Sequence, residues 1–161
     1  MALVFDQEDI VQLVGFHMGS KLFGASILTV REILRAPSVE AMSGAPALVN
    51  GITRLRGAVI PVVSLGNILG VPENRGTHDK PWMLIGLAGR RRVGFIVDGV
   101  TPIVRIQIDA IQPPPEMLLS GLRTKYIRGV CETAKGMLVI VELDRIFREE
   151  EIKALESISA R

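Results

Sequence analysis

Apolar and polar residues alternate over short stretches along most of this chain. The first such stretches are residues 10–18 and 21–25, with Gly19 and Ser20 between them. Alternation with a period of two on both sides of a short glycine-containing turn is typical of a β-hairpin. The pattern therefore predicts that the chain begins with two antiparallel strands.

Residues 51–70 form the most informative segment. Within its part 51–65, polar residues interrupt the first half and the second half is almost continuously apolar. This pattern predicts a strand that passes from half-buried to fully buried. Arg56 and Gly57 lie between the two apolar runs and can form a turn that exposes backbone and one cation. Pro61 cannot donate a ladder hydrogen bond, so we expect the strand at a sheet edge or at a bulge.

The remaining pattern predicts mostly short strands. Residues 27–34 fit a short helical turn before the chain extends, and residues 143–158 place apolar side chains on one face of a C-terminal helix. Short, closely spaced strands are typical of small barrels. Further strands are expected at residues 81–87, 93–97, 101–106, 126–131 and 137–141.

Composition indicates one small β-rich unit. With 161 residues, the chain can form one domain or two closely joined subdomains and can bury a substantial core. Its hydrophobic fraction is 48% but its aromatic fraction only 4%, which favours a core of Val, Ile and Leu. The shortage of aromatic residues also argues against a stand-alone sensor with a small-ligand pocket.

Charge does not indicate nucleic-acid binding. The formal net charge is +2, and the one basic run, residues 90–92, lies between two apolar runs where a hairpin tip is expected. Three arginines on such a tip are usually solvated. Aromatic side chains for base stacking are not interleaved with them, so we predict no nucleic-acid partner.

The motifs of catalysis are also missing. We find no phosphate-binding loop, no metal-spaced His or Cys cluster and no nucleophile elbow. Cys131 is the single cysteine, and His17 and His78 lie in unrelated segments, so an activated thiol is not expected. The sequence predicts a protein without catalytic activity, cofactor or metal, with Cys131 as a buried filler.

Targeting signals are not recognisable in the sequence. The first residues lack the basic start and long apolar run of a signal peptide, and the longest apolar run, residues 58–65, is too short to span a bilayer. We therefore expect a soluble cytoplasmic protein without membrane insertion.

Four segments occur in an order and at a spacing that resemble the CheW family of chemotaxis coupling proteins. The resemblance covers roughly residues 9–148, and it is specific because all four segments are present in order. They are FGASILTVREILR (23–35), GAPALVNGITRLRGAVIPVVSLGNILG (44–70), RVGFIVDGVTPIVRI (92–106) and YIRGVCETAKGMLVIVELDRIF (126–147).

The resemblance implies an all-β fold of two small five-stranded β-barrel subdomains packed together, followed by a C-terminal helix. The N-terminal strand would join the barrel built mainly from the C-terminal half. Residues 9–148 would form a single domain with the subdomain junction near 70–82, and residues 149–161 the helix end and tail. We find no internal repeat in the sequence by eye.

The resemblance also implies a non-enzymatic adaptor. Family members join a CheA-type histidine kinase, through its regulatory domain, to the cytoplasmic helical-hairpin tips of chemoreceptors in membrane-associated arrays. The kinase docks on one barrel, and the receptor helix lies in a groove between the two. A role in a twitching, type IV pilus or other non-flagellar pathway stays open as the alternative.

Two sets of residues carry this implied function. In the kinase surface, Glu32 and Arg56 can form a bidentate pair beside apolar anchors, although a purely structural pair stays equally open. For the receptor surface we expect recognition of a helix in a groove at the subdomain junction. The kinase set is Val30, Glu32, Ile33, Arg56 and Gly57, and the receptor set is Ile27, Leu28, Val97, Asp98 and Val100.

Overall fold

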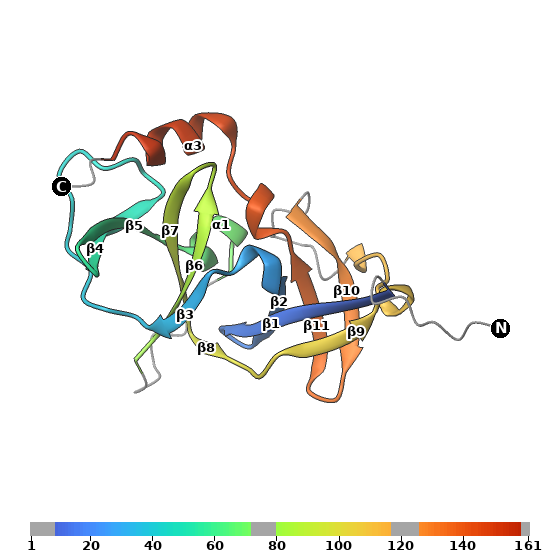
Figure 1. Cartoon of the computed structure of the whole chain (residues 1–161). Coiled ribbons are helices and arrows are strands. Elements are labelled where there is room, and N and C mark those ends of the chain that lie inside the picture. Colours follow the sequence, from blue (N-terminus) through green and yellow to red (C-terminus); the bar gives the residue numbers. More distant parts are fainter. Residues whose placement is uncertain (1–8, 72–79, 117–125, 159–161) are drawn as a thin grey trace.

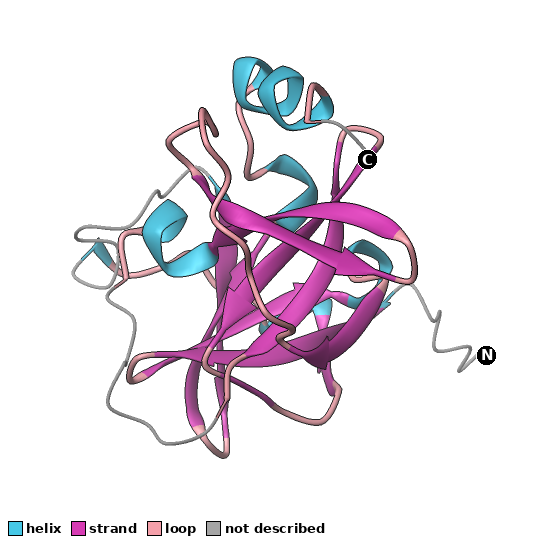
Figure 2. Cartoon of the chain, turned by 90° about the vertical axis from the view of Figure 1, so that its left-hand side faces the viewer, coloured by secondary structure: helices cyan, strands magenta, loops and turns pink. Residues whose placement is uncertain are grey.

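Two β-sheets packed against each other make up the computed structural model, which describes residues 9–71, 80–116 and 126–158. Within these residues eleven strands account for most of the regular structure (Figure 1). The helices are short, and α3 (Glu149–Glu156) lies on the outside of the strands (Figure 2), whereas α1 (Leu65–Leu69) is largely buried. The all-β class expected from the sequence is confirmed.

One sheet has six strands, and the first hairpin of the chain lies at its centre. Its order is β10-β11-β2-β1-β8, with β9 also paired to β1. Every pair is antiparallel except β11–β2, which is parallel. The strands are β1 (Ile10–Met18), β2 (Lys21–Ser26), β8 (Gly99–Val100), β9 (Val104–Gln107), β10 (Ile127–Thr133) and β11 (Gly136–Val141).

The second sheet has five strands in the order β3-β6-β7-β5-β4. Here too a single pair, β5–β7, is parallel and the others are antiparallel. The strands are β3 (Glu32–Arg35), β4 (Val49–Leu55), β5 (Ala58–Ser64), β6 (Trp82–Ala88) and β7 (Arg91–Val97).

The two halves of the chain exchange hairpins. Hairpin β1–β2 lies in the sheet formed by β9, β10 and β11, and hairpin β6–β7 lies in the sheet formed by β3, β4 and β5. Each exchanged hairpin joins its host sheet through a parallel strand pair. Both parallel pairs place a glycine opposite an aliphatic residue, with Gly24 opposite Ile140 in one and Gly94 opposite Val62 in the other. The structure therefore contains an internal repeat that the sequence does not display.

Neither sheet closes into a barrel through a continuous ladder, so the expectation of two five-stranded barrels is corrected to a six-stranded and a five-stranded sheet. An isolated bridge nevertheless joins the segment after β3 to β4 through Glu40–Ile52, and the segment after β9 to β10 through Gln112–Val130. The chain crosses closely at these bridges. A Cβ atom on Gly51 would lie 2.3 Å from the Glu40 carbonyl oxygen.

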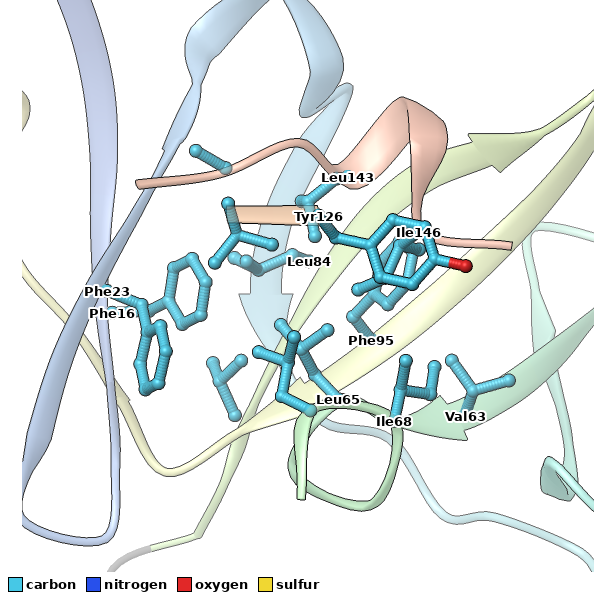
Figure 3. Close-up of a cluster of buried hydrophobic side chains, with 14 of the residues drawn as sticks. Phe16, Phe23, Val63, Leu65, Ile68, Leu84, Phe95, Tyr126, Leu143 and Ile146 are labelled. Carbon is cyan, nitrogen blue, oxygen red and sulfur yellow. The ribbon is translucent and has the colours of Figure 1, made fainter. Parts of the chain in front are cut away.

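Each sheet curls around a small core of its own on one face and contributes its other face to a larger shared core. In the shared core the stacked rings of Phe16 and Phe23, 5.8 Å between centroids, come from the six-stranded sheet and Phe95 from the other (Figure 3). The small cores contain Leu13 and Leu138 in the six-stranded sheet, and Ile60, Val62, Met83 and Ile85 in the five-stranded sheet. The shared core joins the sheets into one body.

The predicted strand over residues 51–65 is instead two strands, β4 and β5, joined by a turn at Arg56 and Gly57. Pro61 does not lie at a sheet edge, because β5 lies inside its sheet, but the alternative of a bulge agrees with the register shift between Val49 and Gly51, next to the Ile52–Pro61 pair. Both backbone polar groups of Ile52, the partner of Pro61 in β4, bond to Glu40 instead of β5. The parallel pairing to β7 begins only at Val62, so Pro61 removes no ladder bond.

The helices differ from expectation at the C-terminus and after β5. Instead of one helix over residues 143–158, a 3₁₀ turn precedes α3, and the Glu151 carboxylate caps the start of α3 by accepting from the Arg148 backbone nitrogen at 2.8 Å. Helix α1 is short and ends at Gly70, whose φ is +80°. The helices are η2 (Ile27–Thr29), α1 (Leu65–Leu69), η3 (Ile108–Ala110), η5 (Leu143–Arg145) and α3 (Glu149–Glu156).

Most of the expected subdomain junction, residues 70–82, and the end of the expected tail, residues 159–161, lie outside the described residues. In the described part of the chain, no helix is both long enough and apolar enough to cross a bilayer.

Candidate partner-binding surfaces

The side chains of Glu32 and Arg56 form a bidentate ion pair. Glu32 begins β3 and Arg56 lies in the β4–β5 turn, so the pair connects the two opposite edges of the five-stranded sheet. Arg56 Nη1 donates to Glu32 Oε1 at 2.9 Å, and Nη2 donates to Oε2. Two parallel hydrogen bonds to one carboxylate fix the planar guanidinium in direction as well as in distance.

The turn that carries Arg56 has an unusual backbone. Arg56 has φ +49° and Gly57 has φ +82°, and positive φ at both central residues is typical of a type I′ hairpin turn. Gly57 adopts this conformation without strain, whereas a residue with a side chain rarely does. Arg56 is the one residue other than glycine with positive φ among those described, and its ion pair to Glu32 stabilises this geometry.

Electrostatics at this pair favour both charged forms. The hydrogen bonds from Arg56 lower the pKa of the Glu32 carboxyl, and the bond to Glu32 raises the pKa of Arg56. Both side chains are reachable from solvent, with 64% of Arg56 and 33% of Glu32 exposed. The pair therefore stays ionised at neutral pH on a surface that a partner can reach.

The other residues of the expected kinase surface differ in exposure. Ile33 in β3 is 40% exposed, and a Cβ atom on Gly57 would meet nothing within 4 Å. Val30 is half-buried and packs against the shared core. Glu32, Ile33, Arg56 and Gly57 thus lie at one accessible end of the five-stranded sheet, while Val30 packs against the shared core.

A second surface surrounds Leu28, which is 86% exposed in η2. Two hollows of about 390 and 290 Å³ flank it and share Ser26, Leu28 and Arg128 in their walls. Ile27 is half-buried and lines the smaller hollow. Two of the expected receptor residues therefore lie at a concave site, whose larger hollow is also lined by charged residues, among them Glu142, Asp144 and Arg145.

The sequence reasoning missed the other walls of this site. Ile10 and Ile108, 42% and 43% exposed, line the smaller hollow with Arg128. They come from β1, η3 and β10, which meet only in the folded sheet. In the sequence, Ile10 and Ile108 are marked only by a neighbouring aspartate, Asp9 or Asp109, at positions where no buried apolar residue is required.

The structure separates the other three expected receptor residues from this site. Val97 is only 1% exposed and belongs to the shared core, so its expected place in a groove is corrected. Asp98 accepts a 2.7 Å hydrogen bond from the Gly19 backbone nitrogen, at the turn of the first hairpin.

Half-buried Val100 pairs with Phe16 in β1, close to the same turn. Leu28 follows Ser26, the partner of Leu13 near the other end of β1. At about 3.3 Å per residue, Val100, opposite Phe16, lies about 10 Å along β1 from Leu13, and Asp98, bonded to Gly19, lies about 20 Å from it. Val97, Asp98 and Val100 therefore do not line the hollows around Leu28.

The single cysteine and the possible metal ligands do not form a site in the described residues. Cys131 is buried, and burial, with a smaller effect of Glu132, raises the pKa of its thiol. A thiol in this environment is unreactive, as the sequence predicts for a filler. Within residues 9–71, 80–116 and 126–158, no group of three or more His, Cys, Asp or Glu side chains could hold a metal ion.

Comparison with known proteins identifies the family. Residues 12–151 match the model of the CheW-like domain. The chain belongs to the CheW family. A similar curated protein is the "Probable chemotaxis protein CheW" of Rhizobium etli, which is 34% identical over 143 residues that make up 89% of this chain and 91% of the relative.

A solved structure agrees with the CheW assignment. The scaffolding protein TtCheW of Thermoanaerobacter tengcongensis superimposes with a TM-score of 0.74 at 28% identity, over 86% of this chain and 88% of its own. Protein PilI of Pseudomonas aeruginosa is 28% identical, but the match covers only 78% of this chain and 70% of PilI. As a CheW-like protein, the chain is a chemotaxis scaffold or adaptor and not an enzyme.

Proposed function

We propose that this CheW-like protein couples a CheA-type histidine kinase to the cytoplasmic helical-hairpin tips of chemoreceptors, in the cytoplasm at membrane-bound signalling arrays. One observation carries the proposal. Residues 27–33 pass from one sheet to the other and bear an exposed apolar residue of each surface, Leu28 and Ile33. A coupling protein needs two different surfaces on one rigid body, and this segment connects them.

The kinase surface is the end of the five-stranded sheet with Glu32, Ile33, Arg56 and Gly57. Its partner is the regulatory domain of the kinase. The ion pair holds the β4–β5 turn against the edge strand β3, and Ile33, the next residue of β3, supplies an exposed apolar contact on the other face of that edge strand. A charged pair next to an aliphatic anchor gives an interface both orientation and buried apolar area.

The receptor surface is the pair of hollows around Leu28. A receptor tip is a helical hairpin, and apolar side chains spaced along one helix face can enter two neighbouring hollows. Ile10, Ile27 and Ile108 give the smaller hollow an apolar wall, and Arg128 stands between the two.

Arg56 tests the proposal in a reconstituted array of receptor fragments, kinase and this protein. Arg56→Ala should lower kinase stimulation by about threefold or more, because it removes the guanidinium that holds the turn. Arg56→Lys should not restore it, because an ammonium group cannot form the bidentate pair. Arg105→Ala, which changes an exposed arginine of β9 in the other sheet, is the matched control.

Melting temperatures of all variants show whether the fold is intact. If folded Arg56→Ala and Arg56→Lys both stimulate the kinase like the wild type, the kinase surface is wrongly assigned. If the wild-type chain binds neither kinase nor receptor, the coupling function itself is rejected.

A further inference from the structure

The end of the five-stranded sheet that carries the Glu32–Arg56 pair also carries Arg92. Glu32 lies opposite Ile85, and Ile85 lies opposite Gly94. Arg92 is two residues from Gly94, and side chains two residues apart on a strand share a face. Glu32 and Arg92 therefore project from the same face, the one that curls around the small core of this sheet.

Positive charge is in excess at this end. Arg56 occupies both carboxylate oxygens of Glu32, so that one carboxylate is already paired with one cation. Arg92 is exposed, and its side chain has no hydrogen bond or ion pair within the part of the chain that the structure describes. It is near enough that its charge contributes to the lowered pKa of Glu32. Two arginines and one glutamate leave a net charge of one positive unit.

The neighbouring arginines have other surroundings. Arg91 points to the opposite side of β7 and donates from Nη2 to the Val59 carbonyl oxygen at 2.9 Å, so the expectation that the whole run 90–92 is solvated is corrected for Arg91. Arg90 lies in the β6–β7 turn, where its backbone nitrogen contacts Glu156 of α3 at 3.3 Å. Of these three arginines, Arg92 alone combines exposure with a place on the Glu32 face.

We propose that Arg92 is a specificity-determining residue of the kinase surface, and that its guanidinium binds a carboxylate on the kinase regulatory domain. This inference rests on the proposed coupling function. Half-buried Leu87 lies directly opposite Arg92 in β6 and provides an aliphatic neighbour for the contact. The partner therefore presents an aspartate or glutamate beside an aliphatic side chain.

A protein carboxylate fits this site better than a nucleic acid does. Phosphate backbones are bound by rows of cations, each neutralising one phosphate. Here one unpaired cation stands beside a paired glutamate and a leucine. A single carboxylate balances that surplus charge, whereas the negative charge of Glu32 would repel a polyphosphate.

The test measures the affinity of the full chain for the regulatory domain of its CheA-type kinase at low and at high salt. Arg92→Gln should weaken binding about two- to tenfold at low salt and flatten the salt dependence, because it removes one charge pair. Arg92→Glu should weaken binding further, and Arg92→Lys should keep most of it. Arg105→Gln, on the other sheet, should bind like the wild type.

Each result decides the inference. Wild-type affinity in Arg92→Gln overturns it, and so does an equal loss in Arg105→Gln, which would indicate a general field effect. A loss in Arg92→Gln and Arg92→Lys alike, with lowered melting temperatures, assigns Arg92 a structural role instead. Wild-type protein that does not bind the kinase at all rejects the proposed function and this inference with it.

Discussion

At the scale of single residues, similar side chains in similar sequence contexts differ in burial. Leu28 and Val97 are both aliphatic, and both were expected in one receptor groove. Leu28 lies in a 3₁₀ turn with 86% of its area exposed, whereas Val97 ends β7 on the face that packs into the shared core. Burial of this kind depends on which face meets the other sheet, and local sequence does not carry that information.

This difference predicts opposite effects of the same substitution. Leu28→Asp should leave the melting temperature close to wild type and abolish receptor binding, because the charge stays in water at the proposed docking site. Val97→Asp should destabilise the fold by several kcal/mol, about 3 or more, because it buries an unpaired carboxylate. Thermal melts beside a receptor-fragment pull-down measure both effects. A strongly destabilised Leu28→Asp, or receptor binding by this variant, would contradict the assignment.

The Glu32–Arg56 pair could be predicted from the sequence, because both residues belong to motifs of the resemblance and have complementary charge. Leu28 was predicted by the same route. Ile10, Ile108 and Arg128 could not be predicted, because they come from three separate segments and share no motif. Neighbouring side chains could be predicted where both residues belong to recognised motifs. They could not be predicted where only the fold brings the side chains together.

At the scale of elements, a glycine lies beside each isolated bridge at which a segment outside the strands bonds to a strand. Gly51 lies beside the bridge from Glu40 to β4, and Gly129 lies beside the bridge from Gln112 to β10. A register shift accompanies each glycine in its hairpin. The absence of a side chain lets an incoming segment bond to the edge strand.

Gly51→Ala should therefore destabilise the protein. Its Cβ atom would lie 2.3 Å from the backbone oxygen of Glu40, which cannot move without loss of the bridge. We expect a cost of about 1–3 kcal/mol, a fall in melting temperature of roughly 3–10 °C. Gly99→Ala is the matched control, because its Cβ atom would meet only His17 Cδ2, at 3.7 Å. Equal melting temperatures for the two variants would show that the bridge is not needed.

Most strands could be predicted from local pattern. Helix α1 and the break before α3 were not predicted, for different reasons. Helix α1 has recognisable caps, because the Ser64 hydroxyl accepts from the Asn67 nitrogen and Gly70 ends the helix with positive φ. These capping residues can be recognised in the sequence, but the apolar run before them favours a strand and not a helix. The break before α3 was harder to predict, because the apolar spacing of residues 143–158 continues through it.

At the scale of the whole molecule, neither sheet belongs to one half of the chain. β1 and β2 lie between β11 and β9, and β7 and β6 lie between β5 and β3. Removal of β1–β2 would leave the β10–β11 ladder and two separate short strands, β8 and β9, and removal of β6–β7 would leave the β4–β5 ladder and β3 alone. Such remnants are barely stable in water. The shared core also takes side chains from both sheets. We propose on this basis that residues 9–148 fold as one domain.

The hairpin exchange predicts how the protein behaves when its chain is divided. Two fragments made by a break between Val71 and Lys80 should each lack a cooperative melting transition, because each sheet then has its central hairpin on the other fragment. Co-expressed, they should copurify in equal amounts and show the circular dichroism of the intact chain. A tag on one fragment, size-exclusion chromatography and thermal melts measure this outcome. A fragment that melts cooperatively alone would show that one sheet is stable without the exchanged hairpin, and the single-domain proposal would then be wrong.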